Sequence, residues 1–320
     1  MGVSRIYRRP VEKAVIFTAN KNFINIYQYL NDRGNSCSVV IPESRLGTNK
    51  IKEIQSLCIS RNIEVLVHPK KGSSLKEFHS RLIEQGYTFA LAWSYSQILA
   101  KDTLELFPKG IWNMHGGKIP QYRGNNVLQW AIVNGEETAG VTWHIMDERI
   151  DHGPILKEGT VPIEPADTAV EVREKIIQKG FELFCRLWEE AGSTGILPYE
   201  VDMEKGYYWK SRNPFDGIIH SDMAEDQIRN LIRAQCPPWP APFAVHEGKV
   251  FRIHGTASQQ GDGVIEYRNK KCSMFLAASL EKDMQTAQEV LRRDTDNESS
   301  NPSAALPAMA GLYGQNGKSG

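Results

Sequence analysis

The chain has 320 residues, with 38 Lys plus Arg and 38 Asp plus Glu, so its formal net charge is zero. A neutral chain has no overall field to attract nucleic acid or an anionic membrane, although a local basic patch stays open. Five scattered cysteines without a C-x-x-C pair argue against a disulfide framework and against a zinc site. The basic N-terminus is followed by no apolar run of about 18 residues, so we predict a cytoplasmic protein of two domains.

The first half of the chain alternates short, β-branched apolar runs with amphipathic stretches, which is the pattern of βα units. We predict strands at 14–19, 38–41, 64–68, 88–93, 110–115 and 140–147, and a further strand or a hairpin at 154–163. Helices are predicted at 22–33, 50–61, 74–84 and 168–191, the third of them with a capping box of Ser74 and Glu77. This pattern predicts an α/β fold over residues 1–197, with a Rossmann-like, mostly parallel sheet and helices on both faces.

After Leu197 the sequence changes to short apolar runs, aromatic residues and prolines. We predict a small, mostly β domain at 198–282, OB-like and shorter than a full barrel, with a helix at 224–234 and strands within 249–280. Residues 283–320 are predicted to be a disordered tail with one short helix at 285–292, because the segment is too polar to fold alone.

An Asn-x-His pair, Asn113 and His115, closes the predicted strand at 110–115. Side chains at i and i+2 of a strand share a face, and ligands bind at the carboxyl edge of an open α/β sheet. An amide and an imidazole side by side are two donors, which is what a tetrahedral oxyanion needs. Asp151 follows the strand at 140–147 and is expected to return beside His115, where it would hold the imidazole and help to move protons.

Each of these features also has a plain structural interpretation. Asn-x-His is common at strand ends, and the Asp151-x-Gly153 pattern is ordinary turn chemistry. The glycines after His115 can simply turn the chain, and Arg123 can be a surface cation or the partner of an anionic substrate group. Three further residues are interpreted as packed or facing solvent: Trp143, His144 and His152. Only the whole constellation indicates catalysis.

As a whole, the segment 111–155 resembles the signature of formyltransferases that use 10-formyltetrahydrofolate, such as the methionyl-tRNA, glycinamide ribonucleotide and sugar-nucleotide N-formyltransferases, including the 4-amino-4-deoxyarabinose formyltransferase of lipid A modification. The matching motifs are Asn113-Met114-His115, Pro120, Tyr122-Arg123-Gly124, Trp130-Ala131-Ile132, Asn134-Gly135-Glu136, Gly140-Val141-Thr142-Trp143-His144 and Asp151-His152-Gly153-Pro154-Ile155. Looser similarity extends over residues 12–255. The chain departs from the family after the histidine, where Gly116-Gly117-Lys118-Ile119-Pro120 replaces the frequent Ser-Leu-Leu-Pro, and this departure concerns the acceptor side.

The resemblance implies an enzyme that takes the formyl group from 10-formyltetrahydrofolate without a metal. It implies that the catalytic residues are Asn113, His115 and Asp151. It implies a folate site formed by Trp93, Ser94, Tyr95, Ile98, Leu99 and Ile150. The acceptor site is expected at Gly116, Gly117, Lys118, Tyr122, Arg123 and Gly124.

Other functions fit the sequence less well. An esterase with an oxyanion loop is disfavoured because no G-x-S-x-G nucleophile elbow occurs, and a nucleotide- or RNA-binding module because neither G-x-G-x-x-G nor a P-loop occurs. The neutral charge favours a small amine acceptor, such as a nucleotide-linked amino sugar, over methionyl-tRNA. Lys118, Arg123 or Arg212 can bind its phosphate or form surface ion pairs, and a homodimer is a further expectation.

Overall fold

The computed structural model describes residues 13–299. The chain divides into two compact units, Met1–Arg212 and Asn213–Gly320. The first unit extends beyond Leu197, where the domain boundary was predicted: Tyr199 pairs with Ile155 in an antiparallel bridge, and β9 (Tyr208–Trp209) pairs with β6 (Arg123–Gly124). The residues 198–212 therefore belong to the first unit.

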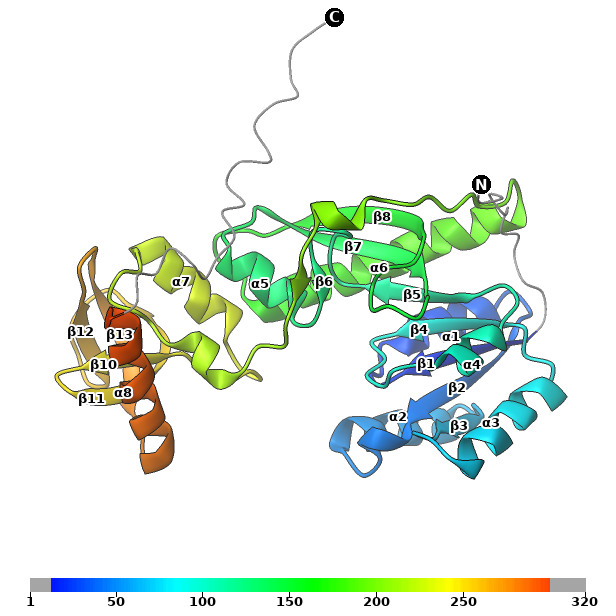
Figure 1. The fold of residues 1–320 in the computed structure, drawn as a ribbon, viewed down its shortest axis with the longest axis horizontal. Helices are drawn as coiled ribbons and strands as arrows, with labels where there is room; N and C mark the ends of the chain where they lie inside the picture. Colours follow the sequence, from blue (N-terminus) through cyan, green and yellow to red (C-terminus); the bar gives the residue numbers. More distant parts are fainter. Residues whose placement is uncertain (1–12, 300–320) are drawn as a thin grey trace, which may run out of the picture. The chain divides into compact units, whose positions relative to one another are not determined.

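The first unit contains one mixed sheet with the strand order β3-β2-β1-β4-β5-β7-β8 (Figure 1). The neighbours from β3 to β5 are parallel, whereas β7 runs antiparallel to both β5 and β8. The predicted α/β fold with a mostly parallel sheet is confirmed. The strands are β1 (Lys13–Thr18), β2 (Ser36–Pro42), β3 (Val65–His68), β4 (Phe89–Trp93), β5 (Ile111–His115), β7 (Thr138–Ile145) and β8 (Ile155–Pro162).

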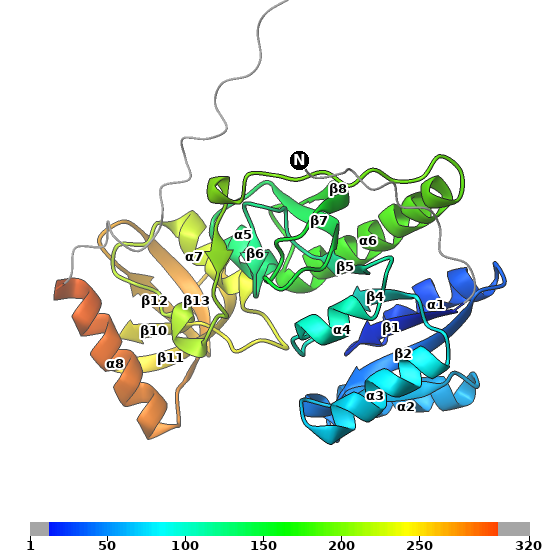
Figure 2. The same cartoon turned by 45° about the vertical axis from the view of Figure 1, so that its right-hand side comes forward.

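Helices cover both faces of this sheet, as Figure 2 shows. α1 and α6 contact each other, and Arg61 after α2 donates to Gln28 of α1, so these helices share one face. On the other face, Phe78 and Leu82 of α3 are buried in an apolar cluster with Phe17. The helices are α1 (Phe23–Asn31), α2 (Asn49–Ser60), α3 (Ser73–Glu84), α4 (Lys101–Glu105), α5 (Val127–Val133) and α6 (Ala169–Gly192).

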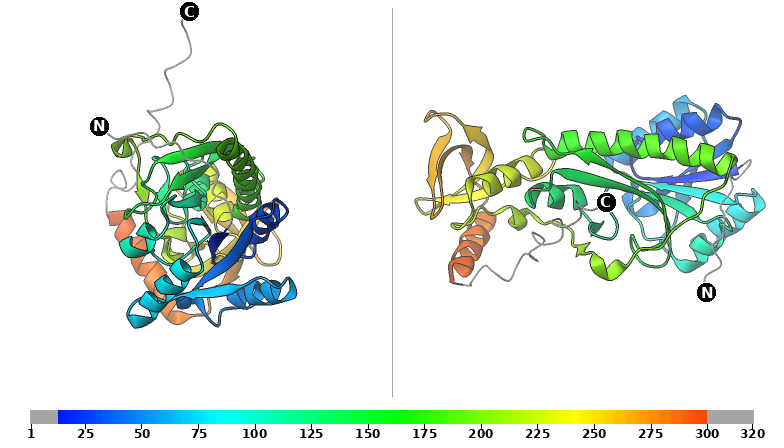
Figure 3. Two further views of the ribbon diagram at one scale, coloured as in Figure 1. Left: turned by 90° about the vertical axis from the view of Figure 1, so that its right-hand side faces the viewer. Right: turned by 90° about the horizontal axis from the view of Figure 1, so that it is seen from above.

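The N-termini of α6 and α3 differ in their caps. Thr168 caps α6 and forms a capping box with Glu171, and Figure 3 shows this long helix lying along β7 and β8. The capping box predicted for Ser74 and Glu77 is wrong, because α3 begins after Gly72, which has a φ of 88° and offers no side-chain oxygen.

The second unit is built on a four-stranded antiparallel sheet with the order β10-β11-β13-β12. Its strands are β10 (Phe243–His246), β11 (Lys249–Ala257), β12 (Val264–Arg268) and β13 (Ser273–Leu280), and helix α7 (Glu225–Ala234) precedes them. Within residues 213–299, no pairing joins β12 to β10. A small β-rich unit is therefore present, and its OB-like character stays a prediction.

The short helix predicted at 285–292 is longer in the structure, where residues Met284–Ser299 of the predicted tail form α8. Val290 on this helix is fully buried against Phe243, Val250 and Ile218. An isolated polar helix is marginal in water, but an apolar contact made with a sheet stabilises it. The remainder of the predicted tail, 300–320, lies outside the described residues.

Replacing Val290 with alanine is expected to destabilise this end of the second unit by about 2 kcal/mol, because the shortened side chain leaves a cavity in the core. Native-state hydrogen exchange of β10 amides, read by mass spectrometry, measures the change. The matched control is Gln288→Ala on the exposed side of the same helix, and equal exchange rates in both variants would contradict the packing of α8.

Among residues 13–299, no helix is long and apolar enough to cross a membrane.

Candidate active site

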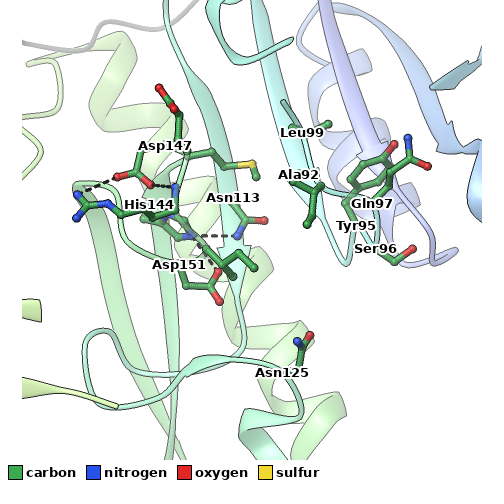
Figure 4. Close-up of a pocket in the computed structure, with 15 residues that line it drawn as sticks. Ala92, Tyr95, Ser96, Gln97, Leu99, Asn113, Asn125, His144, Asp147 and Asp151 are labelled. Carbon is green, nitrogen blue, oxygen red and sulfur yellow. Dashed lines mark hydrogen bonds and ion pairs between the residues drawn. The ribbon is translucent and has the colours of Figure 1, made fainter. Parts of the chain in front are cut away.

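A pocket of about 350 Å³ opens at the carboxyl ends of β4 and β5. The strand order reverses between β1 and β4, where the chain turns from building one half of the sheet to building the other, and ligands bind at such a switch point. The pocket is lined by Ala92, Tyr95, Ser96, Gln97, Ile98, Leu99, Asn113, Asn125, His144, Met146, Asp147, Glu148, Arg149, Ile150 and Asp151. Figure 4 shows the polar groups of β5 and β7 on one side and the loop after β4 on the other.

Asn113 and His144 are directly opposite each other in the antiparallel pairing of β5 and β7. The Asn113 Nδ2 lies 3.0 Å from the His144 Nε2, and the His144 Nδ1 lies 3.1 Å from the carbonyl oxygen of Ile145 (Figure 4). A carbonyl only accepts, so Nδ1 carries the proton, and in the neutral ring Nε2 accepts from the amide. One N–H of Asn113 is thereby held by His144, and the other is left for a ligand.

Asp151 lies between two imidazoles and is almost fully buried. Its Oδ2 accepts a 2.9 Å hydrogen bond from the backbone N–H of Gly124 and lies 3.4 Å from the His115 Nδ1, whereas its Oδ1 lies 3.6 Å from the His144 Nε2. Asp151 has a positive φ of 50°, which turns the chain back toward β5 after the end of β7. The predicted return of this carboxylate beside His115 is what the structure shows.

The surroundings of Asp151 determine its charge. Burial by itself would raise the pKa of the carboxyl group, but the attraction of His115, the hydrogen bond and attraction of His144 and the backbone N–H of Gly124 together lower it to about 2. Asp151 is therefore an anion at neutral pH. An ionised, buried carboxylate can hold imidazole rings in place and stabilise their positive charge.

His115 is placed differently from what the sequence predicts. The ring is buried, its Nε2 donates a 2.6 Å hydrogen bond to the carbonyl oxygen of Tyr122, and its Nδ1 faces Asp151. Asn113 and Asp151 line the pocket, but His115 lies behind Asp151. Both ring nitrogens of His115 thus face protein groups in this structure. The imidazole can contact a ligand in the pocket only after the ring turns.

Gly117 is required by the position of the His115 ring. A Cβ atom added at Gly117 would lie 2.4 Å from the Tyr122 carbonyl oxygen and 2.7 Å from the His115 Nε2. Both distances are well below van der Waals contact. The Gly-Gly sequence after the histidine therefore lets the backbone pass close to the imidazole, in addition to turning the chain.

Replacing Gly117 with alanine is expected to lower kcat at least about tenfold, because the new methyl group displaces the imidazole or its carbonyl partner. Steady-state turnover measures this effect. The control is Gly116→Ala, whose Cβ would meet only the side chain of Ile176 at 3.3 Å, and a larger loss in this control than at Gly117 would contradict the assignment.

The residues expected at the acceptor site do not line the 350 Å³ pocket. Tyr122 is buried, stacks on Trp209 and donates to Glu136. Arg123 donates through NH2 to the carbonyl oxygen of Met203, and Gly124 holds Asp151 through its backbone. Three residues that share this segment also lie outside the pocket lining: Gly116, Gly117 and Lys118.

Four of the six residues expected at the folate site line the pocket, namely Tyr95, Ile98, Leu99 and Ile150. The side chain of Trp93 does not, because it is buried against Trp143. Ser94 lines a neighbouring hollow with residues from the ends of β1 and α2. His144 was expected to pack or to face solvent, and it was not predicted as a site residue, because only the β5–β7 register places it opposite Asn113. In the part of the chain that is described, no group of His, Cys, Asp and Glu is arranged to hold a metal ion.

Comparison with known proteins identifies the family. Residues 13–187 match the family model described as Formyl transferase. A curated relative, the bifunctional polymyxin resistance protein ArnA of Wigglesworthia glossinidia brevipalpis, is 32% identical over 179 residues, which are 55% of this chain and 27% of that protein. The chain thus spans about a quarter of the length of this relative.

Solved structures share the fold. WlaRD, a sugar 3N-formyl transferase, superimposes with a TM-score of 0.65 and 18% identity over 86% of this chain and 100% of that chain. An N-formyltransferase from Helicobacter canadensis gives a TM-score of 0.64 and 17% identity over 85% and 100% of the two chains. Since the family model covers more than half of the 320 residues, the chain belongs to the formyl transferase family.

Proposed function

We propose that the protein is an N-formyltransferase that moves the formyl group of 10-formyltetrahydrofolate to the primary amine of a nucleotide-linked amino sugar or a similar small amine. The observation that carries this proposal is the Asn113 amide, which is oriented by His144 at the mouth of a 350 Å³ pocket and whose second N–H donates to no other group within residues 13–299. An amide N–H fixed in advance at this edge is suited to stabilise an oxyanion.

The pocket suits a folate. The apolar side chains of Ile98, Leu99 and Ile150 line it, and the loop 95–99 uses none of its backbone groups in backbone hydrogen bonds within the described residues. A flat heterocycle with donors and acceptors at its rim can pair with such a free backbone between apolar walls. The structures of WlaRD and the Helicobacter canadensis enzyme were obtained with 5-N-formyl-THF and folinic acid, respectively, which supports this donor.

The reaction needs no protein nucleophile, because the donor carries an activated amide. The nitrogen of the acceptor amine forms a bond to the formyl carbon, and the π electrons of the carbonyl group move to its oxygen. Asn113 donates its second N–H to this oxyanion. The amine nitrogen loses one proton, the N10 nitrogen of the folate gains one, and the bond from N10 to the formyl carbon breaks to release tetrahydrofolate.

The proton passes between these nitrogens through the imidazoles beside Asp151. A carboxyl group with a pKa of about 2 is a weak base, so Asp151 acts as a fixed negative charge that stabilises the protonated form of His115 or His144. When His144 is protonated, its Nε2 must donate, and Asp151 is the acceptor within reach. His115 lies on the other side of the Asp151 carboxylate. Its ring contacts the reacting groups after it turns away from Asp151.

The acceptor is an amine that carries an anionic group. Arg123 supports this assignment, because its buried Nε has no hydrogen-bond partner among the described residues and lies next to Gly124, which binds Asp151. The structures of WlaRD and the Helicobacter canadensis enzyme were obtained with dTDP and dTDP-3-aminofucose, respectively. These ligands favour a sugar nucleotide, and methionyl-tRNA is the alternative acceptor.

The test is a turnover assay with 10-formyltetrahydrofolate and a panel of nucleotide-linked amino sugars, free amines and methionyl-tRNA. Release of tetrahydrofolate and a product mass increased by one formyl group identify the reaction. Product with one sugar nucleotide is the expected result. Formation of product with methionyl-tRNA alone would contradict the assignment of a sugar-nucleotide acceptor. Absence of folate binding would contradict the assignment of 10-formyltetrahydrofolate as the donor.

A further inference from the structure

The loop after β4, residues 94–99, is held in place by side chains. Its residues from Tyr95 to Leu99 all line the pocket. Within the described residues, the N–H and C=O groups of 95–99 form no backbone hydrogen bond, and only Ser94 accepts one, from Ala19. A loop without backbone bonds of its own takes its shape from the side chains that anchor it.

Two of these anchoring side chains meet at one atom, the Nδ1 of His68. The Tyr95 hydroxyl group lies 2.8 Å from this nitrogen, and the Gln97 Nε2 lies 3.0 Å from it. The Gln97 amide also donates to the carbonyl oxygens of His68 and Pro69, at 3.0 and 3.1 Å. His68 does not line the pocket, but it contacts two residues that do.

The His68 ring itself is fixed by packing. It ends β3, is 2% exposed, and is packed against Phe78 and Phe17. The Gln97 nitrogen only donates and the Tyr95 hydroxyl group can donate, so the tautomer with an unprotonated Nδ1 makes both contacts favourable. Burial, opposed only in part by Asp102 and Glu43, lowers the pKa of His68 to about 4, so the ring stays neutral and keeps this acceptor at neutral pH.

We propose that His68 is a positioning residue for the formyl donor: its Nδ1 accepts from Tyr95 and Gln97 and thereby holds the loop 94–99 in the shape that presents its free backbone groups to the folate. This inference rests on the proposed function, because it assumes that the folate binds in this pocket. Without the His68 Nδ1, the Tyr95 hydroxyl group and the Gln97 amide lose their common hydrogen-bond partner. The loop then samples other conformations before the folate binds.

The test compares His68→Leu with His68→Asn, whose Oδ1 can replace Nδ1 as an acceptor. We expect His68→Leu to raise the KM for 10-formyltetrahydrofolate and the dissociation constant of 5-formyltetrahydrofolate about tenfold or more, with the KM for the acceptor amine unchanged. His68→Asn is expected to recover most of the affinity. The matched control is His79→Leu, because His79 lies on α3 and bonds to Thr103 and not to the loop.

The outcomes separate this inference from the proposed function. If the unchanged protein does not bind 5-formyltetrahydrofolate in calorimetric titration, the proposed function fails and the inference fails with it. If the unchanged protein binds and His68→Leu binds equally well, only the inference is overturned. Should His68→Leu not fold, Gln97→Leu tests the same link from the loop side, and unchanged folate affinity there would overturn the role of His68.

Discussion

Asp151→Asn is expected to lower kcat/KM roughly a thousandfold, while the protein stays folded. The substitution keeps the size of the side chain, and asparagine tolerates the left-handed backbone conformation at this position, where φ is 50°. It removes the negative charge that lies 3.4 Å from His115 and 3.6 Å from His144. Neither ring can then be held as a cation when the amine releases its proton, so steady-state turnover should show the loss in kcat.

The same substitution should change the pH dependence of stability. A carboxyl group whose pKa falls from 3.8 to about 2 on folding contributes about 2 kcal/mol to the free energy of unfolding at neutral pH. A lowered pKa means that this contribution is present above pH 4 and is lost as the pH falls toward 2. Urea unfolding at several pH values between these limits should therefore show a steeper loss for the unchanged protein than for Asp151→Asn.

Asp147→Asn is the matched control for both measurements. Asp147 also lines the pocket, but its carboxylate faces His152 and Arg149 and contacts neither Asn113 nor Asp151. We expect it to retain turnover within about tenfold of the unchanged protein. A loss as large as that of Asp151→Asn would mean that the total negative charge of the pocket matters, and not the position of one carboxylate between two imidazoles.

The second large effect is expected for Asn113→Ala, which should lower kcat by a factor of about 10² to 10³, the usual result of losing one oxyanion donor. The amide of Asn113 is held by His144 before any substrate arrives, so its stabilisation of the oxyanion requires no rearrangement. Because the oxyanion exists only in the transition state and the intermediate, the KM for the folate should change little.

Asn125→Ala separates this role from a general loss of polarity. Asn125 lines the same pocket, yet Figure 4 shows its side chain away from the Asn113, His144 and Asp151 group. We expect a loss of less than about tenfold in kcat for this variant. If Asn113→Ala behaves like Asn125→Ala, the oxyanion is stabilised elsewhere and the proposed mechanism is wrong.

The sheet and most of its helices could be predicted because their signals are local. β4, for example, is buried along its entire length and reads as an unbroken apolar run. The end of the first unit could not be predicted, since β9 belongs to this unit through contacts with residues distant in sequence, such as its pairing with β6 more than 80 residues earlier in the chain. Helix α8 was missed in part because its stability comes from the contact of Val290 with Phe243, which no periodicity of a polar segment reveals.

The candidate site could be predicted in composition but not in arrangement. Asn113, His115 and Asp151 follow from their motifs, whereas His144 needed the register between β5 and β7. The direction of a side chain in a strand buried on both sides could not be predicted from the sequence either. Trp93 was expected at the folate site, but its ring faces Trp143. A motif fixes which residues are near the reaction, and the fold decides which of their atoms are turned toward it.

The antiparallel pairing of β7 with β5 has a consequence for how this enzyme can change. Along β7, Trp143 and His144 face opposite sides of the sheet, the first toward the core and the second toward the pocket. A slip of one residue in this pairing would exchange them, burying a histidine in the apolar core and placing an indole in the active site. Changes in β7 that shift this pairing should therefore abolish the arrangement of the site, because the register determines which side chain lies opposite Asn113.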